Sequence, residues 1–483
     1  MPTQSAIDQS RSLSRVQELL QTGLATEAAL LCESILGDLP TDAAALRLMG
    51  ECCLALGDFK GAWHYTDCAL RSEPNDPETL NNAAVLCFQG RQYETALNLL
   101  HKALSLRPDY ADAHQNLAAV YGRVTLADTK AAIKTHQLLR TLQWFSANCA
   151  DDERAEIVVE NRRLRQTLLA EHHNRFGASK QRILLYSPSL KMGALYYIFE
   201  SWQQCLEYLG VPAKLVTTDD DLKVSLEAFR PTTLISVDTE AVVTAPFDRV
   251  LSEYSRTKSL RLGLCSEFRG NERDADFRIT FHLDPSRDEV LARQTTPLLS
   301  LPFAFNPLIH FAQPACELWD FAFVGTNSEL KLQETTDYLL PIVRSHGGIL
   351  AGTGWPGRFM NLRQSEAALL YGFAAICPNY HLRAQIERFS EVNERTHVLA
   401  AVGAFQLVDK PAALGSLYDE SELAIANSPA EYVKLFAHFR SQPQERRQMA
   451  TAAMRKAWSR FSQFHVLARV LRFLDGQASS PLR

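Results

Sequence analysis

The feature that most constrains this chain is a repeat of 34 residues in its first third. Windows that begin at Gln9, Ala43 and Pro77 carry the same residue types at matching positions. The eighth, twentieth and twenty-seventh positions are small or aliphatic, and the thirty-second is always proline: Val16, Gly50 and Ala84; Ala28, Ala62 and Ala96; Ile35, Ala69 and Ala103; Pro40, Pro74 and Pro108. Small residues let two antiparallel helices approach closely, and the proline ends the second helix. One such pair cannot bury its apolar face alone, so the units are predicted to stack into a solenoid.

This pattern resembles the tetratricopeptide repeat. A fourth window from Ala111 lacks the turn glycine and carries Lys130 where alanine is expected, so we interpret it as a degenerate capping repeat. The sixth position of the first helix holds Asn82 and Asn116, with Asn81 beside the former. Asparagine both donates and accepts hydrogen bonds. The resemblance to tetratricopeptide-repeat protein glycosyltransferases, which use asparagine ladders, implies that these three residues bind an acceptor peptide. The alternative is that they are solvated and have no role.

Composition excludes several classes of protein. The 483 residues include 50 basic and 55 acidic side chains, a net charge of −5, which argues against a nucleic-acid partner. The sequence shows no apolar run long enough for a transmembrane helix and no apolar stretch in its first dozen residues, so we expect no integral membrane association. The ten cysteines are scattered and form no CxxC pair, so no zinc site is predicted and a reducing cytoplasm is favoured.

From Gln181 onward, short apolar runs alternate with helical stretches, and a second series of the same kind begins at Trp319. This alternation predicts parallel, doubly wound sheets. No GxGxxG motif follows a first strand, which disfavours a dinucleotide dehydrogenase. The predicted fold class is α plus α/β, with four segments: a tetratricopeptide α-solenoid at 1–145, a helical linker at 146–180, a first Rossmann-like domain at 181–313, and a second with a terminal helix at 314–483.

The run from Asn393 to Phe461 resembles the C-terminal domain of GT-B glycosyltransferases, in the branch related to spore-maturation-type enzymes. The matching features are an Asn-x-Arg start, a glycine after a short helix, an apolar strand that ends in Asp, an acidic segment and a Pro-Glu-like helix start: Asn393, Arg395, Gly403, Asp409, 418–422 and 429–431. The resemblance implies two Rossmann-like domains that face a cleft, a nucleotide-sugar donor, no cofactor and no obligatory metal.

The resemblance also implies a set of donor-binding residues. GT-B enzymes stabilise the departing diphosphate with backbone amides, a helix N-terminus and a basic side chain, and glycines at strand ends let the backbone approach phosphate. The expected residues are Gly325, Thr326, Asn327, Gly352, Gly354, Trp355, Asn393, Glu394, Arg395 and Gly403. Trp355 stacks on a base or sugar, or it is a packed core aromatic. One position departs from the family pattern: Val398 stands where many members carry a glutamate that holds the ribose, and Glu394 lies one helical turn before it.

A catalytic base of an inverting enzyme is expected at a strand end of the first Rossmann-like domain. The candidates are Asp238, Glu267 and His282, and their alternative roles are a helix cap, a loop charge and a satisfied turn residue. A retaining enzyme needs no base there. The acidic run 219–221 precedes a predicted helix, where carboxylates favour the N-terminus, so we assign it no metal.

Three hypotheses follow. The first is a glycosyltransferase that moves a sugar to a hydroxyl of a protein acceptor recruited by the solenoid, with flagellin-type proteins as acceptors suggested by the resemblance. The second keeps the enzyme and replaces the acceptor by a lipid-linked or capsular glycan. The third is a non-catalytic scaffold whose second half is degenerate.

Overall fold

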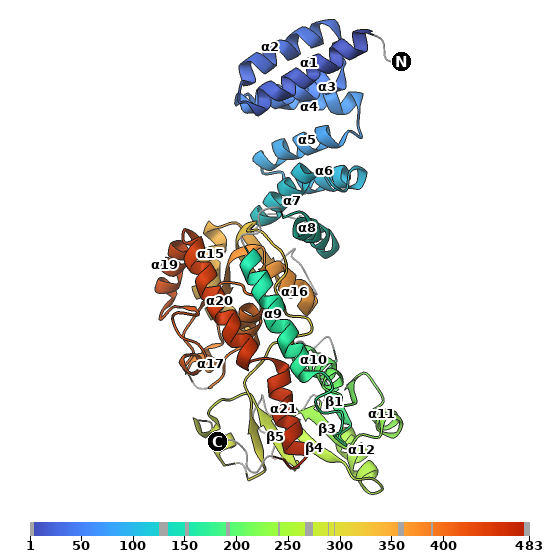
Figure 1. The fold of residues 1–483 in the computed structure, drawn as a ribbon, viewed down its shortest axis with the longest axis vertical. Coiled ribbons are helices and arrows are strands. Elements are labelled where there is room, and N and C mark those ends of the chain that lie inside the picture. Colours follow the sequence, from blue (N-terminus) through green and yellow to red (C-terminus); the bar gives the residue numbers. More distant parts are fainter. Residues whose placement is uncertain are drawn as a thin grey trace. The chain divides into compact units, whose positions relative to one another are not determined.

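The computed structural model of the chain describes residues 4–124, 134–149, 154–189, 194–239, 242–265, 274–287, 289–293, 295–355, 362–387 and 390–477. By its internal contacts the chain divides into two compact units. The first comprises Met1–Asn148 and Gly347–Met360, and the second comprises Cys149–His346 and Asn361–Arg483. Each unit is described by itself (Figure 1).

The first third of the chain is helical, as the repeat predicts. Four antiparallel pairs follow one another: α1 Gln4–Gln21 and α2 Ala25–Asp38, α3 Ala43–Ala55 and α4 Phe59–Ser72, α5 Pro77–Gln89 and α6 Tyr93–Leu106, α7 Ala111–Arg123 and α8 Thr135–Asn148. Aspartates begin three of these helices, since Asp42, Asp58 and Asp76 each accept a hydrogen bond from a backbone amide three residues later.

The small repeat residues lie where the paired helices touch. Ala28, Ala62 and Ala96 are fully buried. A Cβ atom added at Gly50 would lie 2.8 Å from Oγ1 of Thr66 on the partner helix. Close helix approach is therefore the physical reason for small residues at the eighth and twentieth positions.

Two α/β domains follow the repeats. After α9 Ala155–His172, the first contains β1 Ile183–Ser187, α10 Ala194–Tyr208, β2 Ala213–Thr217, α11 Leu222–Phe229, β3 Thr233–Val237, α12 Ala245–Ser255, β4 Arg261–Cys265, β5 Phe277–Thr280, η2 Pro285–Arg287, α13 Glu289–Ala292 and β6 Leu298–Ser300. The second contains β7 Trp319–Val324, η3 Glu329–Lys331, α14 Leu332–Glu334, η4 Thr335–Leu339, α15 Leu340–Ser345, β8 Gly348–Ala351, α16 Gln364–Tyr371, β9 Ala374–Asn379, α17 Arg383–Glu387, α18 Glu394–Ala401, β10 Gln406–Val408, η5 Leu414–Ser416, β11 Ala424–Ile425 and α19 Pro429–Arg440, followed by α20 Pro443–Arg460 and α21 Gln463–Leu474.

Both sheets have the parallel pairing that the alternation of strands and helices predicts. The first has the order β2-β1-β3-β4-β5-β6, and the second has the order β11-β10-β9-β7-β8. In the first sheet every neighbouring pair is parallel. Because parallel strands bring their carboxyl ends to one edge, the side chains after β1, β3 and β5 share an edge, and those after β7 and β9 share another.

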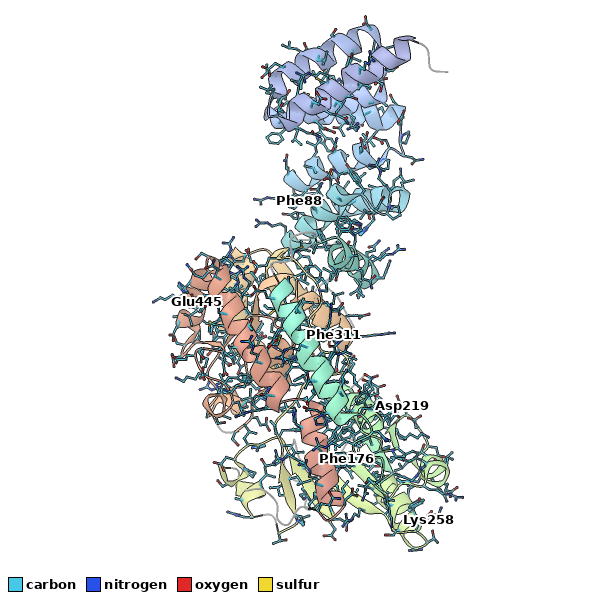
Figure 2. All side chains as sticks on the ribbon, in the orientation of Figure 1. Phe88, Phe176, Asp219, Lys258, Phe311 and Glu445 are labelled. Atoms are coloured by element: carbon cyan, nitrogen blue, oxygen red, sulfur yellow. The ribbon has the colours of Figure 1, made fainter. Side chains whose placement is uncertain are left out.

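Helix α9 packs within the second unit. It lies beside α20 (Figure 1). Arg154 donates hydrogen bonds to the carbonyls of Gly372, Val402 and Gly403. Arg165 donates to the carbonyls of Pro307 and Leu308, and its guanidinium carbon lies 4.1 Å from the ring centre of Phe311, which Figure 2 labels.

Two helical segments depart from a single regular helix. The predicted terminal helix consists of two helices: α20 ends at Arg460, and Ser462 caps α21 by accepting a hydrogen bond from the amide of His465. The segment 329–345 is helical, but its middle widens into a π-helix at η4. Pro341 lacks the N–H that a regular helix would use there, and π-turns are frequent near functional sites.

Candidate active site

The N-terminus of α18 is the centre of the site in the second α/β domain. Asn393 is its cap, and its side-chain oxygen accepts hydrogen bonds from the amide and the hydroxyl of Thr396, each at 3.0 Å. The sequence prediction of a helix after Asn393 is thus confirmed. The first amides of such a helix have no intrahelical partner and carry partial positive charge, which favours a bound anion.

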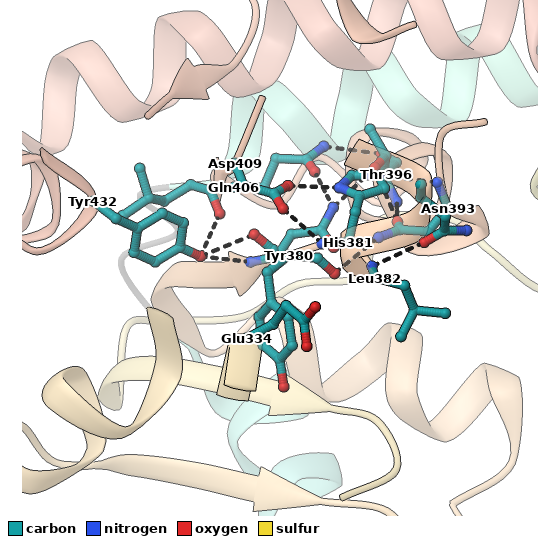
Figure 3. Close-up of polar contacts among 12 residues, drawn as sticks. Glu334, Tyr380, His381, Leu382, Asn393, Thr396, Gln406, Asp409 and Tyr432 are labelled. Atoms are coloured by element: carbon teal, nitrogen blue, oxygen red, sulfur yellow. Dashed lines mark hydrogen bonds and ion pairs between the residues drawn. The ribbon is translucent and has the colours of Figure 1, made fainter. Parts of the chain in front are cut away.

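A buried polar network beneath α18 fixes this cap (Figure 3). His381 Nδ1 lies 2.6 Å from Oδ1 of Asp409, and the amide of Asn393 donates to Nε2 of His381 at 3.0 Å. Because Nε2 accepts the amide hydrogen, the proton between the ring and Asp409 lies on Nδ1. The side chain of Asn393 donates to the side chain of Asn379 and to the carbonyl of Tyr380. The cap is therefore held from both strand ends, β9 and β10.

Arg395, on the first turn of α18, lies between aromatic side chains and a strand end. Its guanidinium carbon is 4.4 Å from the ring centre of Phe323, the penultimate residue of β7. A Cβ atom at Gly325 would collide with its Nη2 atom. Burial raises the pKa of Tyr371, and Arg395 opposes that rise through its charge and a hydrogen bond. The structure thus brings together Gly325 and Arg395, which are far apart in the sequence.

Lys331 adds a second cation that sequence reasoning missed. Burial and, to a lesser extent, the nearby charge of Arg395 lower its pKa to about 8, while Glu334 acts in the opposite direction. Glu334 is itself held by the amide of Arg383 at 2.8 Å. Two mutually repelling cations, one on η3 after β7 and one on the first turn of α18, form a site that an anion stabilises. The sequence feature that could have indicated Lys331 is its position six residues after Gly325, the glycine directly after β7.

Glu394, which precedes Arg395 on α18, carries a carboxyl group whose pKa is raised rather than lowered. Burial raises the pKa of its carboxyl to about 7, although Arg395 opposes that rise. Its Oε1 atom is buried and has no hydrogen-bond partner among the residues that the structure describes. A carboxyl group with a pKa near neutrality exchanges protons readily under physiological conditions. Val398, one turn later, is buried.

The remaining expected donor residues have varied surroundings. Thr326 and Asn327 follow Gly325 directly after β7, and Gly352 and Gly354 follow β8 with φ angles of 114° and 83°, a region that favours glycine. Trp355 is only 4% exposed, as a packed aromatic would be. Gly403, with φ at 64°, packs so closely on α9 that a Cβ would collide with Ile157. The structure therefore gives Gly403 a packing role at the far end of α18.

Asp238, a candidate base, is committed to an ion pair. Arg278 on β5 donates to its Oδ2 at 2.7 Å, and both side chains are almost fully buried. The alternative role as a helix cap is wrong, since α12 begins at Ala245 and its N-cap is Thr244. The other oxygen, Oδ1, has no partner within the described ranges. Oδ2 of Asp238 is thus committed to Arg278, and its assignment as the base stays a prediction.

His282 and Glu267, the other candidate bases, have different outcomes. Nε2 of His282 lies 2.9 Å from Oε1 of Glu391, a residue of the second α/β domain, and both side chains are buried. His282 thus has the hydrogen-bond partner that the alternative role of a satisfied residue expects, and its assignment as the base stays a prediction. Glu267 lies outside the described residues.

The asparagines of the repeats contact one another and a glutamate. Asn116 on α7 donates to Oδ1 of Asn81 on α5 at 2.8 Å. Asn82 donates to Oε1 of Glu51 on α3 at 2.7 Å. The amide groups therefore connect the first helices of three successive repeats, although part of their hydrogen-bonding capacity is used within the protein.

The acidic run 219–221 is explained by local bonds. Asp221 caps α11 through the amide of Val224, and Asp220 accepts from the amide and the hydroxyl of Thr217. Within the part of the chain that the structure describes, no group of three or more His, Cys, Asp or Glu side chains is placed to hold a metal ion.

Comparison with known families matches two parts of the chain. Residues 336–472 match a family model described as glycosyl transferase-like. Residues 85–124 match a model described as TPR repeat, the tetratricopeptide repeat. The chain is a glycosyltransferase with tetratricopeptide repeats. A search of curated proteins returns no match.

Solved structures similar to this glycosyltransferase include three that match different lengths of its chain. A mutant of the Thermobaculum terrenum O-GlcNAc transferase is 15% identical, with 99% of each chain covered and a TM-score of 0.38. Anabaena HepE in complex with UDP and glucose is 12% identical, with 61% of this chain and 100% of that chain covered and a TM-score of 0.44. Yersinia enterocolitica SycD is 18% identical, with 25% and 86% covered and a TM-score of 0.22.

The matched region of the glycosyltransferase contains the α18 part of the site. Residues 336–472 include α18, its cap Asn393 and Arg395. Lys331 and Gly325, the residue directly after β7, precede the matched region. Among the described helices, none is long and apolar enough to cross a membrane.

Proposed function

We propose that this glycosyltransferase moves a sugar from a nucleotide-sugar donor to a hydroxyl group of a protein acceptor. The observation that carries the donor half of the proposal is the position of Arg395 on the first turn of α18, 4.4 Å from the ring centre of Phe323 and next to the backbone of Gly325, with the charge of Lys331 close enough to act on it. Two cations, free helix amides and a strand-end glycine together fit a diphosphate.

The chemistry of the transfer explains why such a site accelerates it. The acceptor oxygen forms a bond to the anomeric carbon, the bond from that carbon to the diphosphate oxygen breaks, and its electron pair stays on the departing diphosphate. The acceptor hydroxyl proton passes to a base or to the diphosphate itself. Because negative charge grows on the leaving group, fixed positive groups stabilise the transition state more than the bound donor. No metal is required in this proposal.

The acceptor half of the proposal is supported by the repeats. Asn82 and Asn116 lie partly exposed on α5 and α7, one repeat apart, and their amides are held in place by Glu51 and Asn81. An amide with one bond to the protein retains donor or acceptor capacity for a peptide backbone. The contact reads the main chain and so tolerates varied side chains, as recruitment of different protein segments requires.

The double variant Asn82→Ala/Asn116→Ala tests recruitment in the full chain. Transfer of radiolabelled sugar to protein in an extract of the source cells is expected to fall about tenfold, while hydrolysis of the donor to free nucleotide is unchanged. Gln115→Ala, an exposed neighbour on α7, is the matched control. Undiminished transfer to protein would show that the asparagines do not recruit the acceptor. Labelling of lipid or polysaccharide instead of protein would show that the acceptor is a glycan or a lipid-linked saccharide.

A further inference from the structure

A short segment before α18 contacts both α/β domains. We call residues 390–393 the strap. At its start, the amide of Leu283 donates to the carbonyl of Ser390 at 2.8 Å, and the amide of Asp284 donates to Oγ of Ser390 at 2.7 Å. Residues 282–284 follow β5 of the first α/β domain, so the strap begins with bonds to the opposite domain.

The second residue of the strap adds a buried polar contact. Oε1 of Glu391 lies 2.9 Å from Nε2 of His282, with side-chain exposures of 6% and 4%. Its other oxygen accepts from Nε2 of Gln385 at 3.2 Å, within its own domain. Removal of one partner from such a buried pair leaves an uncompensated polar group, which costs far more than loss of an exposed pair.

The last residue of the strap is the cap of α18. The amide of Asn393 donates to His381, which Asp409 locks, and two residues later Arg395 lies on the first helical turn. Four consecutive residues thus connect the strand end that carries His282 to the helix that carries the proposed diphosphate-binding arginine.

We infer that Glu391 is a positioning residue, which holds His282 and thereby couples the approach of the two α/β domains to the placement of α18 and Arg395. In this role the Nε2 atom of His282 is the partner of Glu391 across the domains, so Nε2 is not the atom that takes a proton from an acceptor. The inference rests on the proposed function only for its effect on donor binding, since the effect on α18 is a property of the protein alone.

Three variants separate this role from general structural damage. Glu391→Ala removes the partner of His282, Glu391→Gln keeps an oxygen that accepts from an imidazole N–H, and His282→Ala removes the other side of the contact. Glu420→Gln, at an exposed glutamate, controls for the loss of charge. Thermal unfolding checks that each variant folds.

The first measurement is amide hydrogen exchange of α18 without nucleotide. Glu391→Ala and His282→Ala are expected to raise exchange at residues 394–401 by about tenfold, while Glu391→Gln and Glu420→Gln leave it near the wild-type value. Unchanged exchange in Glu391→Ala would overturn the inference, whether or not the chain binds a nucleotide sugar.

The second measurement is calorimetric binding of the nucleoside diphosphate that the wild-type chain binds best among UDP, GDP and dTDP. Both alanine variants are expected to weaken binding about tenfold and to raise the donor KM with little change in kcat. The double variant Glu391→Ala/His282→Ala is expected to bind the nucleotide no more weakly than either single variant, since both substitutions remove the same contact.

Unchanged affinity with a large fall in kcat for His282→Ala alone would assign His282 as the base and overturn the inference. Absence of binding by the wild-type chain contradicts the proposed function, and the exchange measurement then decides the inference.

Discussion

At the scale of single residues, the lowered pKa of Lys331 gives donor binding a dependence on pH. Lys331 is a cation whose pKa is lowered to about 8 by burial and by Arg395. It binds a diphosphate only when protonated, so donor affinity is expected to fall about tenfold between pH 7 and pH 9, as the protonated fraction does. Calorimetry at several pH values measures this fall.

The matched variants for this prediction are Lys331→Arg and Lys331→Met. The arginine variant is expected to bind donor with little pH dependence in this range, since its guanidinium stays charged, and the methionine variant is expected to bind weakly throughout. Lys434→Met, at an exposed lysine, serves as the control. A fall in affinity with rising pH that persists in Lys331→Arg would assign the titration to another group.

The raised pKa of Glu394 predicts that the stability of the chain, rather than donor binding, depends on pH. Burial raises the pKa of its carboxyl from the ordinary 4.5 to about 7, so the folded chain favours the protonated form. The free energy of unfolding therefore loses a contribution as pH rises from about 4.5 to 7. Glu394→Gln removes this loss, so the variant should gain on the order of 1 kcal/mol over the wild type at pH 8 and little at pH 4.5. Urea unfolding at the two pH values measures the difference, and an equal effect at both would contradict the assignment.

At the scale of elements, the site depends on how closely β7 approaches α18. A Cβ atom at Gly325 would collide with the guanidinium of Arg395 and lie 3.0 Å from the ring of Phe323. Because the end of the arginine side chain can move, Gly325→Ala is expected to displace it with little loss of stability and to weaken donor binding about tenfold. Gly415→Ala, where the added Cβ meets nothing within 4 Å, is the control. Wild-type affinity in Gly325→Ala would show that the position of Arg395 is not limiting.

The sequence predicted the helices and strands better than it predicted the contacts of the site. The recurring prolines and small residues predicted the helical pairs, and the apolar runs predicted the strands, because both signals are local. The break between α20 and α21 escaped prediction, since it depends on the cap that Ser462 supplies. The π-helix at η4 escaped it too, although Pro341 was visible in the sequence.

At the scale of the whole molecule, the site joins residues that lie far apart in the chain. The resemblance named Gly325 and Arg395 as members of one site, but only the structure shows that they touch. Lys331 and Glu391 went unnoticed, because their significance comes from Arg395 and His282, partners that no local pattern connects to them. The base remains a prediction, with Asp238 occupied by Arg278.

The most direct test of the account is calorimetric titration of the full chain with UDP, GDP, dTDP and CMP and with their sugar conjugates, alongside Arg395→Ala and an Arg460→Ala control at an exposed position. The account predicts that one class of nucleotide binds the wild type and the control, and that Arg395→Ala weakens this binding at least tenfold. Absence of binding across the panel by well-folded protein, or binding that Arg395→Ala leaves intact, would contradict a donor site at the N-terminus of α18.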